Sequence, residues 1–179
     1  MARVMDDSER YGTVTRVLHW GMALLFAAQF LSALAHFALG RENALRQALW
    51  SYHPTLGTTL FLLVLLRGVW GLANLSRRPP HPGALGTAAV WGHVTLYALM
   101  IAVPLAKLIG AAGGTRPFSY LGVQIFPGQA SQVGWMHSIG EWHPTLGWLL
   151  ALVILGHMSM ALIWHRAIKE DGVVTRMTG

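Results

Sequence analysis

The sequence contains no cysteine and few charged residues. The lack of cysteine excludes disulfide bonds, thiolate metal sites and cysteine-ligated iron–sulfur clusters. Charged residues make up 11% of the 179 residues and hydrophobic residues 54%, whereas about a quarter of a soluble domain is charged. The chain cannot cover a globular surface with polar groups. We therefore expect one membrane-embedded domain over residues 1–179.

Acidic residues are the scarcest charged group, because 13 Lys and Arg face only 7 Asp and Glu. A basic chain can be a nucleic-acid binder. In membrane proteins, however, excess Lys and Arg marks cytoplasmic loops, and here the basic residues lie beside apolar runs. We expect the lipid bilayer, and no nucleic acid, as a partner.

Four apolar runs are long enough to cross a membrane. They lie at about 14–37, 53–73, 90–109 and 143–164, and about 20 helical residues at 1.5 Å each cover the hydrocarbon core. Gly, Pro and charged residues fill the connections. These runs predict an all-α integral membrane protein, a bundle of four spanning helices.

The basic residues also predict the orientation, since an even number of spans places both termini on one side. Nine basic residues lie in the two terminal segments, in the second loop and at the adjoining ends of the helices. Four lie in the first and third loops and at the helix ends that adjoin them. This bias predicts cytoplasmic termini and a long third loop on the outer side. The larger set is Arg3, Arg10, Arg16, Arg67, Arg77, Arg78, Arg166, Lys169 and Arg176; the smaller is Arg41, Arg46, Lys107 and Arg116.

Nine histidines in so apolar a chain need an explanation, because ionisable groups inside spans are rare and usually functional. The residues His-Pro-Thr-Leu-Gly occur twice, at 53–57 and 143–147, where spans two and four are predicted to open from the outer side. His53 and His143 should then lie at matching depth on parallel helices. The alternative is that the repeat is only a favoured helix start, since Pro suits the first turn.

A second pair is predicted nearer the inner side. His157 follows His143 by 14 residues, about four turns and about 21 Å of rise, which returns it to nearly the same helix face. His19 begins the first span, also on the inner side. The sequence thus predicts an outer pair His53–His143 and an inner pair His19–His157 that share the fourth span.

Haem fits two pairs of histidines better than other groups do. Zinc needs three or four protein ligands, and a proton relay normally includes Asp or Glu, which the spans lack well inside. Haem iron needs only two axial ligands from the protein. Two imidazoles fill both positions and leave none for oxygen to bind. We therefore predict His19, His53, His143 and His157 as axial ligands of two haems b. A transporter that uses histidines for protons or a metal remains an alternative.

Other polar residues near the spans have open roles. His93 opens the third span and either contacts a haem propionate, lines a quinone pocket or sits at the interface. Arg67 pairs with a propionate or with a phospholipid. His165 and Lys169, after the fourth span, either form an inner quinone site or extend to the membrane surface as a cationic face.

Three histidines receive no assigned role. His36 and His137 lie on the outer side, where each either serves an electron donor or does nothing, and His81 lies in a Pro-rich loop.

Motifs along nearly the whole chain resemble the bacterial cytochrome b561 family. They are Arg-Val-Leu-His-Trp at 16–20, the motif at 53–57, Gly-His-Val-Thr-Leu-Tyr at 92–97, Trp-His at 142–143, Gly-His at 156–157 and a basic tail. The resemblance implies a multi-pass protein of the bacterial inner membrane, with two haems b held by histidines of spans one, two and four. Some members resemble superoxide oxidases that reduce ubiquinone, so this oxidoreductase activity is implied; no catalytic residue is assigned.

These observations lead to a hypothesis for electron flow. Electrons enter from a periplasmic one-electron donor, either superoxide or a redox protein, pass from the outer pair to the inner pair, and leave to ubiquinone. For superoxide, Lys107 and Arg116 are the candidates to attract the anion. The alternative is an electron-transfer subunit without its own substrate, which docks a dehydrogenase or soluble cytochrome on the third loop through Phe118, Tyr120, Phe126 and Trp135.

Overall fold

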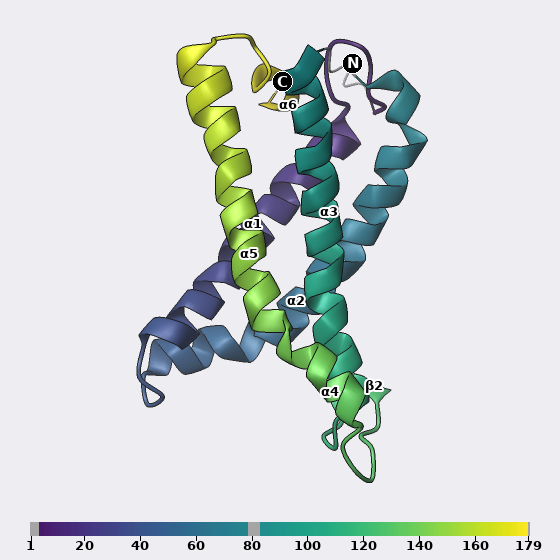
Figure 1. Ribbon diagram of the computed structural model, residues 1–179, viewed down its shortest axis with the longest axis vertical. Helices are drawn as coiled ribbons and strands as arrows, with labels where there is room; N and C mark the ends of the chain where they lie inside the picture. The colour runs from purple at the N-terminus through teal and green to yellow at the C-terminus, as the bar shows by residue number, and fades with distance from the viewer. Residues whose placement is uncertain (1–3, 79–82, 179) are drawn as a thin grey trace.

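The computed structural model describes residues 4–78 and 83–178 and contains four long helical segments, whose arrangement is shown in Figure 1. Three of them are α1 (Thr13–Ala38), α2 (Ala44–Ala73) and α3 (Gly83–Ala112). The fourth is a nearly continuous stretch that comprises α4 (Gly134–Glu141), α5 (His143–Ser159) and a π-helix, η2 (Met160–Ile168). All four are long and apolar enough to cross a membrane, which confirms the predicted all-α, four-helix membrane architecture.

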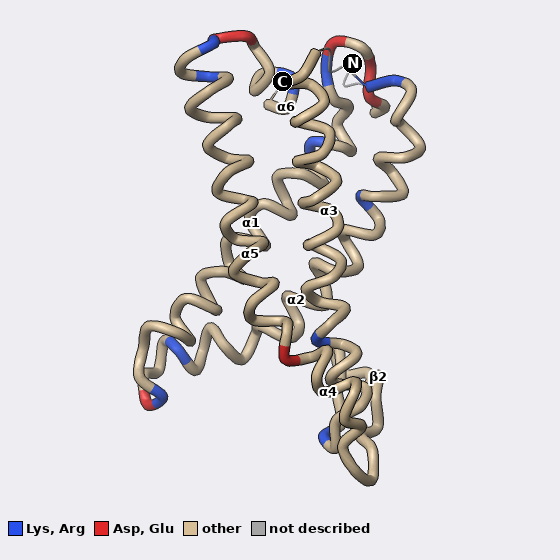
Figure 2. Tube along the Cα trace, in the orientation of Figure 1, with Lys and Arg blue, Asp and Glu red and all other residues tan. Residues whose placement is uncertain are grey.

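Both ends of the described chain lie at one end of the bundle (Figure 1). We call it the terminal end, and the opposite end, which holds a short β-hairpin, the hairpin end. Charged residues gather mainly at the terminal end (Figure 2). The chain ends are joined there by hydrogen bonds from the Tyr11 amide to the Arg176 carbonyl, 3.1 Å, and from Trp20 Nε1 to the Met177 carbonyl, 3.2 Å. That this end faces the cytoplasm remains a prediction.

Helix α2 begins upstream of its predicted start at His53. Asn43 caps it by accepting a hydrogen bond from the Arg46 amide, as short polar residues do at helix N-termini. Its first part runs across the hairpin end before the helix turns along the bundle (Figure 1). Pro54 lies inside the helix, where its missing N–H accounts for the bend. The prediction that the motif at 53–57 opens a helix is therefore wrong.

The second copy of the motif follows the prediction. His143 is the first residue of α5, and Pro144 occupies its first turn. Helix α4 precedes it directly, with only Trp142 between the two helices. The first copy thus lies inside α2, whereas the second begins α5 directly after α4.

The third loop contains the antiparallel hairpin β1 (Phe118–Tyr120) and β2 (Val123–Phe126), which the sequence did not predict. Leu121 and Gly122 form its two-residue turn, with φ of 49° and 82°. Positive φ at both turn positions matches the twist of a tight hairpin. The Tyr120 hydroxyl lies 3.0 Å from Thr59 Oγ1, which fixes the hairpin against α2.

The protein core is thin and lies where α1, α2, α3 and α5 meet. Many large apolar side chains point outward, Leu24 and Leu72 among them, as expected of helices that face lipid. Two short elements complete the fold, η1 (Leu75–Arg77) and α6 (Thr175–Thr178). The buried core cluster consists of Met22, Val64, Leu96, Met100, Val103 and Leu150.

Helices α3 and α4 approach closely at two glycines. A Cβ added to Gly110 would lie 2.9 Å from the Cα of Gly140. Small residues permit such contact between helix backbones inside membranes. The contact positions α4, and through it the start of α5 at His143.

Candidate functional site

The two histidines of the outer pair face one another near the hairpin end. His53 in α2 and His143 in α5 have ring centroids 6.2 Å apart and ring planes at 87°. A metal–imidazole nitrogen bond is about 2 Å long, so two imidazoles on opposite sides of one ion have centroids roughly 6 Å apart. The structure thus brings these rings to a separation at which both could bind one metal ion.

Hydrogen bonds determine which nitrogen of His53 carries the proton. The Ser32 hydroxyl donates to the Gln29 carbonyl at 2.7 Å, so its oxygen is left to accept from His53 Nδ1 at 2.8 Å. The proton therefore resides on Nδ1, and Nε2 keeps its lone pair. The Gln29 side-chain amide donates to that lone pair at 3.1 Å. A metal at Nε2 would need this amide to move aside.

His143 has the same tautomer by a different contact. Its Nδ1 lies 2.9 Å from the Val103 backbone carbonyl, which can only accept, so Nδ1 donates and Nε2 keeps its lone pair. Ligating histidines commonly donate their other N–H to an oxygen in this way, which fixes the ring orientation. Both outer imidazoles therefore present a basic nitrogen.

Three histidines cluster farther along the bundle. The rings of His19 in α1 and His157 in α5 are 6.4 Å apart, at 49°. His93 in α3 lies 5.4 Å from His157 and donates through Nδ1 to the Ala89 carbonyl at 2.7 Å. His19 Nδ1 is buried without a hydrogen-bond partner among the described residues. The predicted inner pair thus lies together, with His93 beside it.

Arg67 of α2 is half-buried and lies beside Tyr97, which follows His93 by one turn of α3. Its guanidinium carbon lies 5.6 Å from the Tyr97 ring centroid, a cation–π distance. Its Nε is buried and has no hydrogen-bond partner within the described chain. An anionic acceptor would satisfy that donor, and both a haem propionate and a lipid phosphate are of this kind.

The donor set fits haem. Within residues 4–78 and 83–178, no group of three or more His, Cys, Asp or Glu side chains could hold a metal ion. Each pair offers two neutral nitrogen ligands, too few for a closed zinc site but the number that a porphyrin-bound iron needs.

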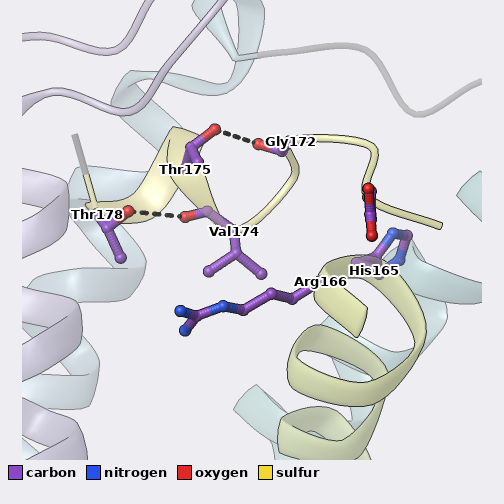
Figure 3. A pocket seen from close by; sticks show the side chains of 7 residues that line it. His165, Arg166, Gly172, Val174, Thr175 and Thr178 are labelled. Carbon is purple, nitrogen blue, oxygen red and sulfur yellow. Dashed lines mark hydrogen bonds between the residues drawn. The ribbon is translucent and has the colours of Figure 1, made fainter. Parts of the chain in front are cut away.

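The residues predicted for a quinone site lie at the terminal end. His165 lines a cavity of about 400 Å³ with Arg166 and Val174 (Figure 3). Its Nδ1 is 2.8 Å from Asp171 Oδ2, and that hydrogen bond lowers the pKa of the Asp171 carboxyl below its usual value. Lys169 Nζ is 4.0 Å from the same oxygen and outside the cavity lining.

The remaining predicted residues are dispersed. His137 pairs with Glu141 at 3.4 Å on exposed α4, Lys107 and Arg116 are exposed, and His81 lies outside the described residues. His36 stacks on Trp50, with ring centroids 3.7 Å apart.

The aromatic residues proposed for docking on the third loop are partly used within the fold. Phe118 and Phe126 pair across the hairpin, with ring centroids 6.0 Å apart, and Tyr120 bonds α2. Trp135 is 62% exposed and remains available for an external contact.

Sequence reasoning missed Gln29, Ser32 and Trp50. Gln29 and Ser32 are polar residues three apart in an apolar run, a spacing that places both on one helix face. That pattern was the available signal. Nothing in the sequence indicated that the Val103 carbonyl would hold His143.

Two comparisons with known proteins bear on this geometry. A family model described as prokaryotic cytochrome b561 matches residues 10–179. The chain is also similar to cytochrome b561 homolog 2 of Escherichia coli strain K12, with 26% identity over 97% of this chain and 94% of that protein.

Proposed function

Because the chain belongs to the prokaryotic cytochrome b561 family, and is thus a membrane b-type cytochrome of electron transfer, we propose that it holds two haems b and transfers electrons across the bacterial inner membrane. The supporting observation is the pair of histidine contacts at two levels of α5: His143 faces His53, and His157 faces His19. The 14 residues between His143 and His157 correspond to about 21 Å of helix. One haem at each level, held by the two histidines of that level, would account for the arrangement.

Bound haem iron supplies reversible one-electron chemistry, and two imidazole ligands leave no coordination site for oxygen. The protein's own contribution is to hold each ring. Ser32 and the Val103 carbonyl keep the protons of His53 and His143 on Nδ1, which leaves the ligand lone pair of each ring on Nε2. At His53 the Gln29 amide, 3.1 Å from Nε2, would move aside when a ligand bond forms. For the inner level, His93 and Arg67 are proposed to bind the haem propionates. His93 lies 5.4 Å from His157, and the buried Arg67 Nε has no hydrogen-bond partner within the described chain.

The direction of electron flow is proposed from the ends of the bundle. With the terminal end in the cytoplasm, as the basic residues predict, a periplasmic one-electron donor delivers electrons at the hairpin end, and ubiquinone accepts them at the terminal end. Superoxide is the proposed small donor. His165 and Lys169 are the proposed quinone residues, and the His165–Asp171 contact offers a proton route to a reduced quinone.

A second candidate function is a subunit that receives electrons only from a docked protein. Its support is the exposed apolar side of the hairpin, where Leu121, Val123 and Ile125 are 73%, 63% and 46% exposed. Purified protein that reduces ubiquinone with superoxide, and without any partner, would rule against this candidate. Protein that turns over only after a soluble redox protein is added would favour it.

A spectrum and a haem assay test the proposal. Reduced-minus-oxidised difference spectra should show b-type bands, and a haem determination should give two per chain. Replacing His143 by Ala should remove one haem and leave the other, whereas replacing His157 should remove the other one. One haem per chain in the unaltered protein, or loss of neither haem in these variants, would refute the pairing.

A further inference from the structure

Three aromatic rings form a stack at the hairpin end. Trp50 packs on His53, with centroids 4.4 Å apart and planes at 25°. It also packs on His36, at 3.7 Å and 21°. No ring contact joins His36 directly to His53 within the described chain, so Trp50 lies between the two imidazoles. The stack therefore joins the C-terminal turn of α1 to a proposed haem ligand in α2.

Arg46 holds the outermost ring of the stack. Its Nε donates to the His36 carbonyl at 3.2 Å, and its terminal nitrogen lies 3.5 Å from His36 Nε2. Arg41 precedes it in the same connection, where Gln47 Nε2 donates to the Arg41 carbonyl at 3.0 Å. Two cations against Glu42 alone give this turn a positive charge, which raises the local concentration of a small anion.

The stack is open to the surroundings at its middle ring. Trp50 is 38% exposed and lies one helical turn from Arg46. Packing alone would be served by an aliphatic side chain of similar volume. Parallel rings in contact also form a continuous π system. This system shortens the distance that an electron must tunnel between an outside molecule and His53.

We propose that the His36–Trp50–His53 stack is the route by which an electron enters the outer level of the protein from a small anionic one-electron donor. The inference rests on the proposed function, because it takes the outer haem as the acceptor. The donor loses one electron and that haem gains it. No proton moves and no bond forms or breaks, and Trp50 ends in its original oxidation state.

Stopped-flow reduction of the purified, full-length holoprotein tests this. Dithionite serves as the probe, because its reductant is the small sulfur dioxide radical anion, and the haem alpha band reports the rate. The His143→Ala variant, which lacks the outer site, supplies the rate of direct reduction of the inner level. Trp50→Leu should slow the outer phase by about tenfold, and Trp50→Phe, which keeps a ring, should restore most of the rate.

The matched control is Trp135→Leu. Trp135 is also exposed near the hairpin end but has no ring contact within residues 4–78 and 83–178, so this variant should reduce at the unaltered rate. Haem content and the midpoint potential of the outer site are measured for every variant. A slower rate at unchanged content and potential supports an electron route and excludes a purely structural role for Trp50.

A wild-type outer rate in Trp50→Leu with full haem content would overturn the proposal. If Trp50→Leu loses its outer haem, His36→Leu decides, because that ring touches Trp50 and not His53. An unchanged rate in His36→Leu would then overturn the proposal, and a slower one would support it. Absence of haem from the unaltered protein would instead defeat the proposed function itself.

Discussion

The imidazole of His143 donates a hydrogen bond to the backbone carbonyl of Val103, 2.9 Å away on a different helix. This contact connects a proposed haem ligand at the first residue of α5 to the C-terminal half of α3. The corresponding contact for His53 is made by a side chain, the Ser32 hydroxyl of α1. The two outer imidazoles are therefore oriented by two different helices, and each orientation can be altered separately.

Replacing Ser32 by Ala should weaken the outer site. His53 loses the acceptor for its Nδ1 proton, and loss of such a supporting bond typically costs about 10- to 100-fold in metal-site affinity. Haem content after extended washing with a haem-binding competitor measures the effect. Ser138→Ala is the control, because that exposed hydroxyl donates to the Gly134 carbonyl within its own helix α4. Equal haem retention in both variants would contradict the assigned role of Ser32.

Replacing Gly110 by Ala should separate α3 from α4. The added methyl group would lie 2.9 Å from the Gly140 Cα, so backbone must shift, at a cost of about 1–3 kcal/mol. Because α4 leads directly into His143, we expect a lower thermal midpoint together with reduced content of the outer haem. Gly21→Ala, where no atom outside the adjacent helix backbone lies within 4 Å of the new methyl group, should lower neither. A Gly110→Ala protein with the wild-type midpoint would show that the contact is not tight.

Replacing Asp6 by Asn should destabilise the terminal end. The buried Asp6 carboxylate accepts from the Gly12 amide at 2.9 Å, from Thr15 Oγ1 at 2.6 Å and from Arg78 Nε at 3.1 Å. The amide can accept fewer bonds and leaves Arg78 without its counter-charge, a loss of about 2 kcal/mol for bonds to a charged group. The thermal midpoint in detergent should fall, while exposed Glu42→Gln should leave it unchanged. No fall in Asp6→Asn would mean that the network contributes nothing net.

The Asp171 carboxyl should produce an acid-dependent change at the terminal end. Its pKa is lowered in the folded protein, first by the hydrogen bond with His165. A group of this kind stabilises the fold above its unfolded pKa, and the contribution is lost as the pH falls through the folded pKa. Proteolysis of the tail should therefore accelerate below a pH of about 4. In Asp171→Asn, proteolysis of the tail should already be fast at neutral pH and should not accelerate further below this pH. An acceleration of unchanged size in that variant would show that another group causes it.

The sequence predicted the features that depend on period and composition. Apolar length predicted four helices, and the helical repeat predicted that His143 and His157 would share a side of α5 at two levels. The partners His53 and His19 followed from the predicted side of the membrane on which each span begins. The assignment of these residues to haem, and of the terminal end to the cytoplasm, stays a prediction.

The features that were missed depend on contacts between segments far apart in the chain. Pro54 looked like a helix start because Pro suits a first turn, yet Asn43 already caps the helix upstream, and the missing N–H only bends it. The hairpin was missed because Leu121 adopts a positive φ that its side chain does not favour. Gln29 and Ser32 acquire their roles only once α1 packs on α2.

The π-helix at Met160–Ile168 has a consequence for how this chain can vary. A π turn is equivalent to one residue inserted into an α-helix, and it rotates everything beyond it by about 100°. The insertion lies after His157, so the spacing of His143 and His157 is untouched while the position of His165 is reset. Deleting a single residue in this stretch would reorient the tail and its cavity and would break the contacts of the tail with Tyr11 and Trp20. The two ends of the fourth helical segment can thus change independently. The spacing of His143 and His157 fixes one end, and the rotation of the helix beyond the π-helix sets the direction of the other.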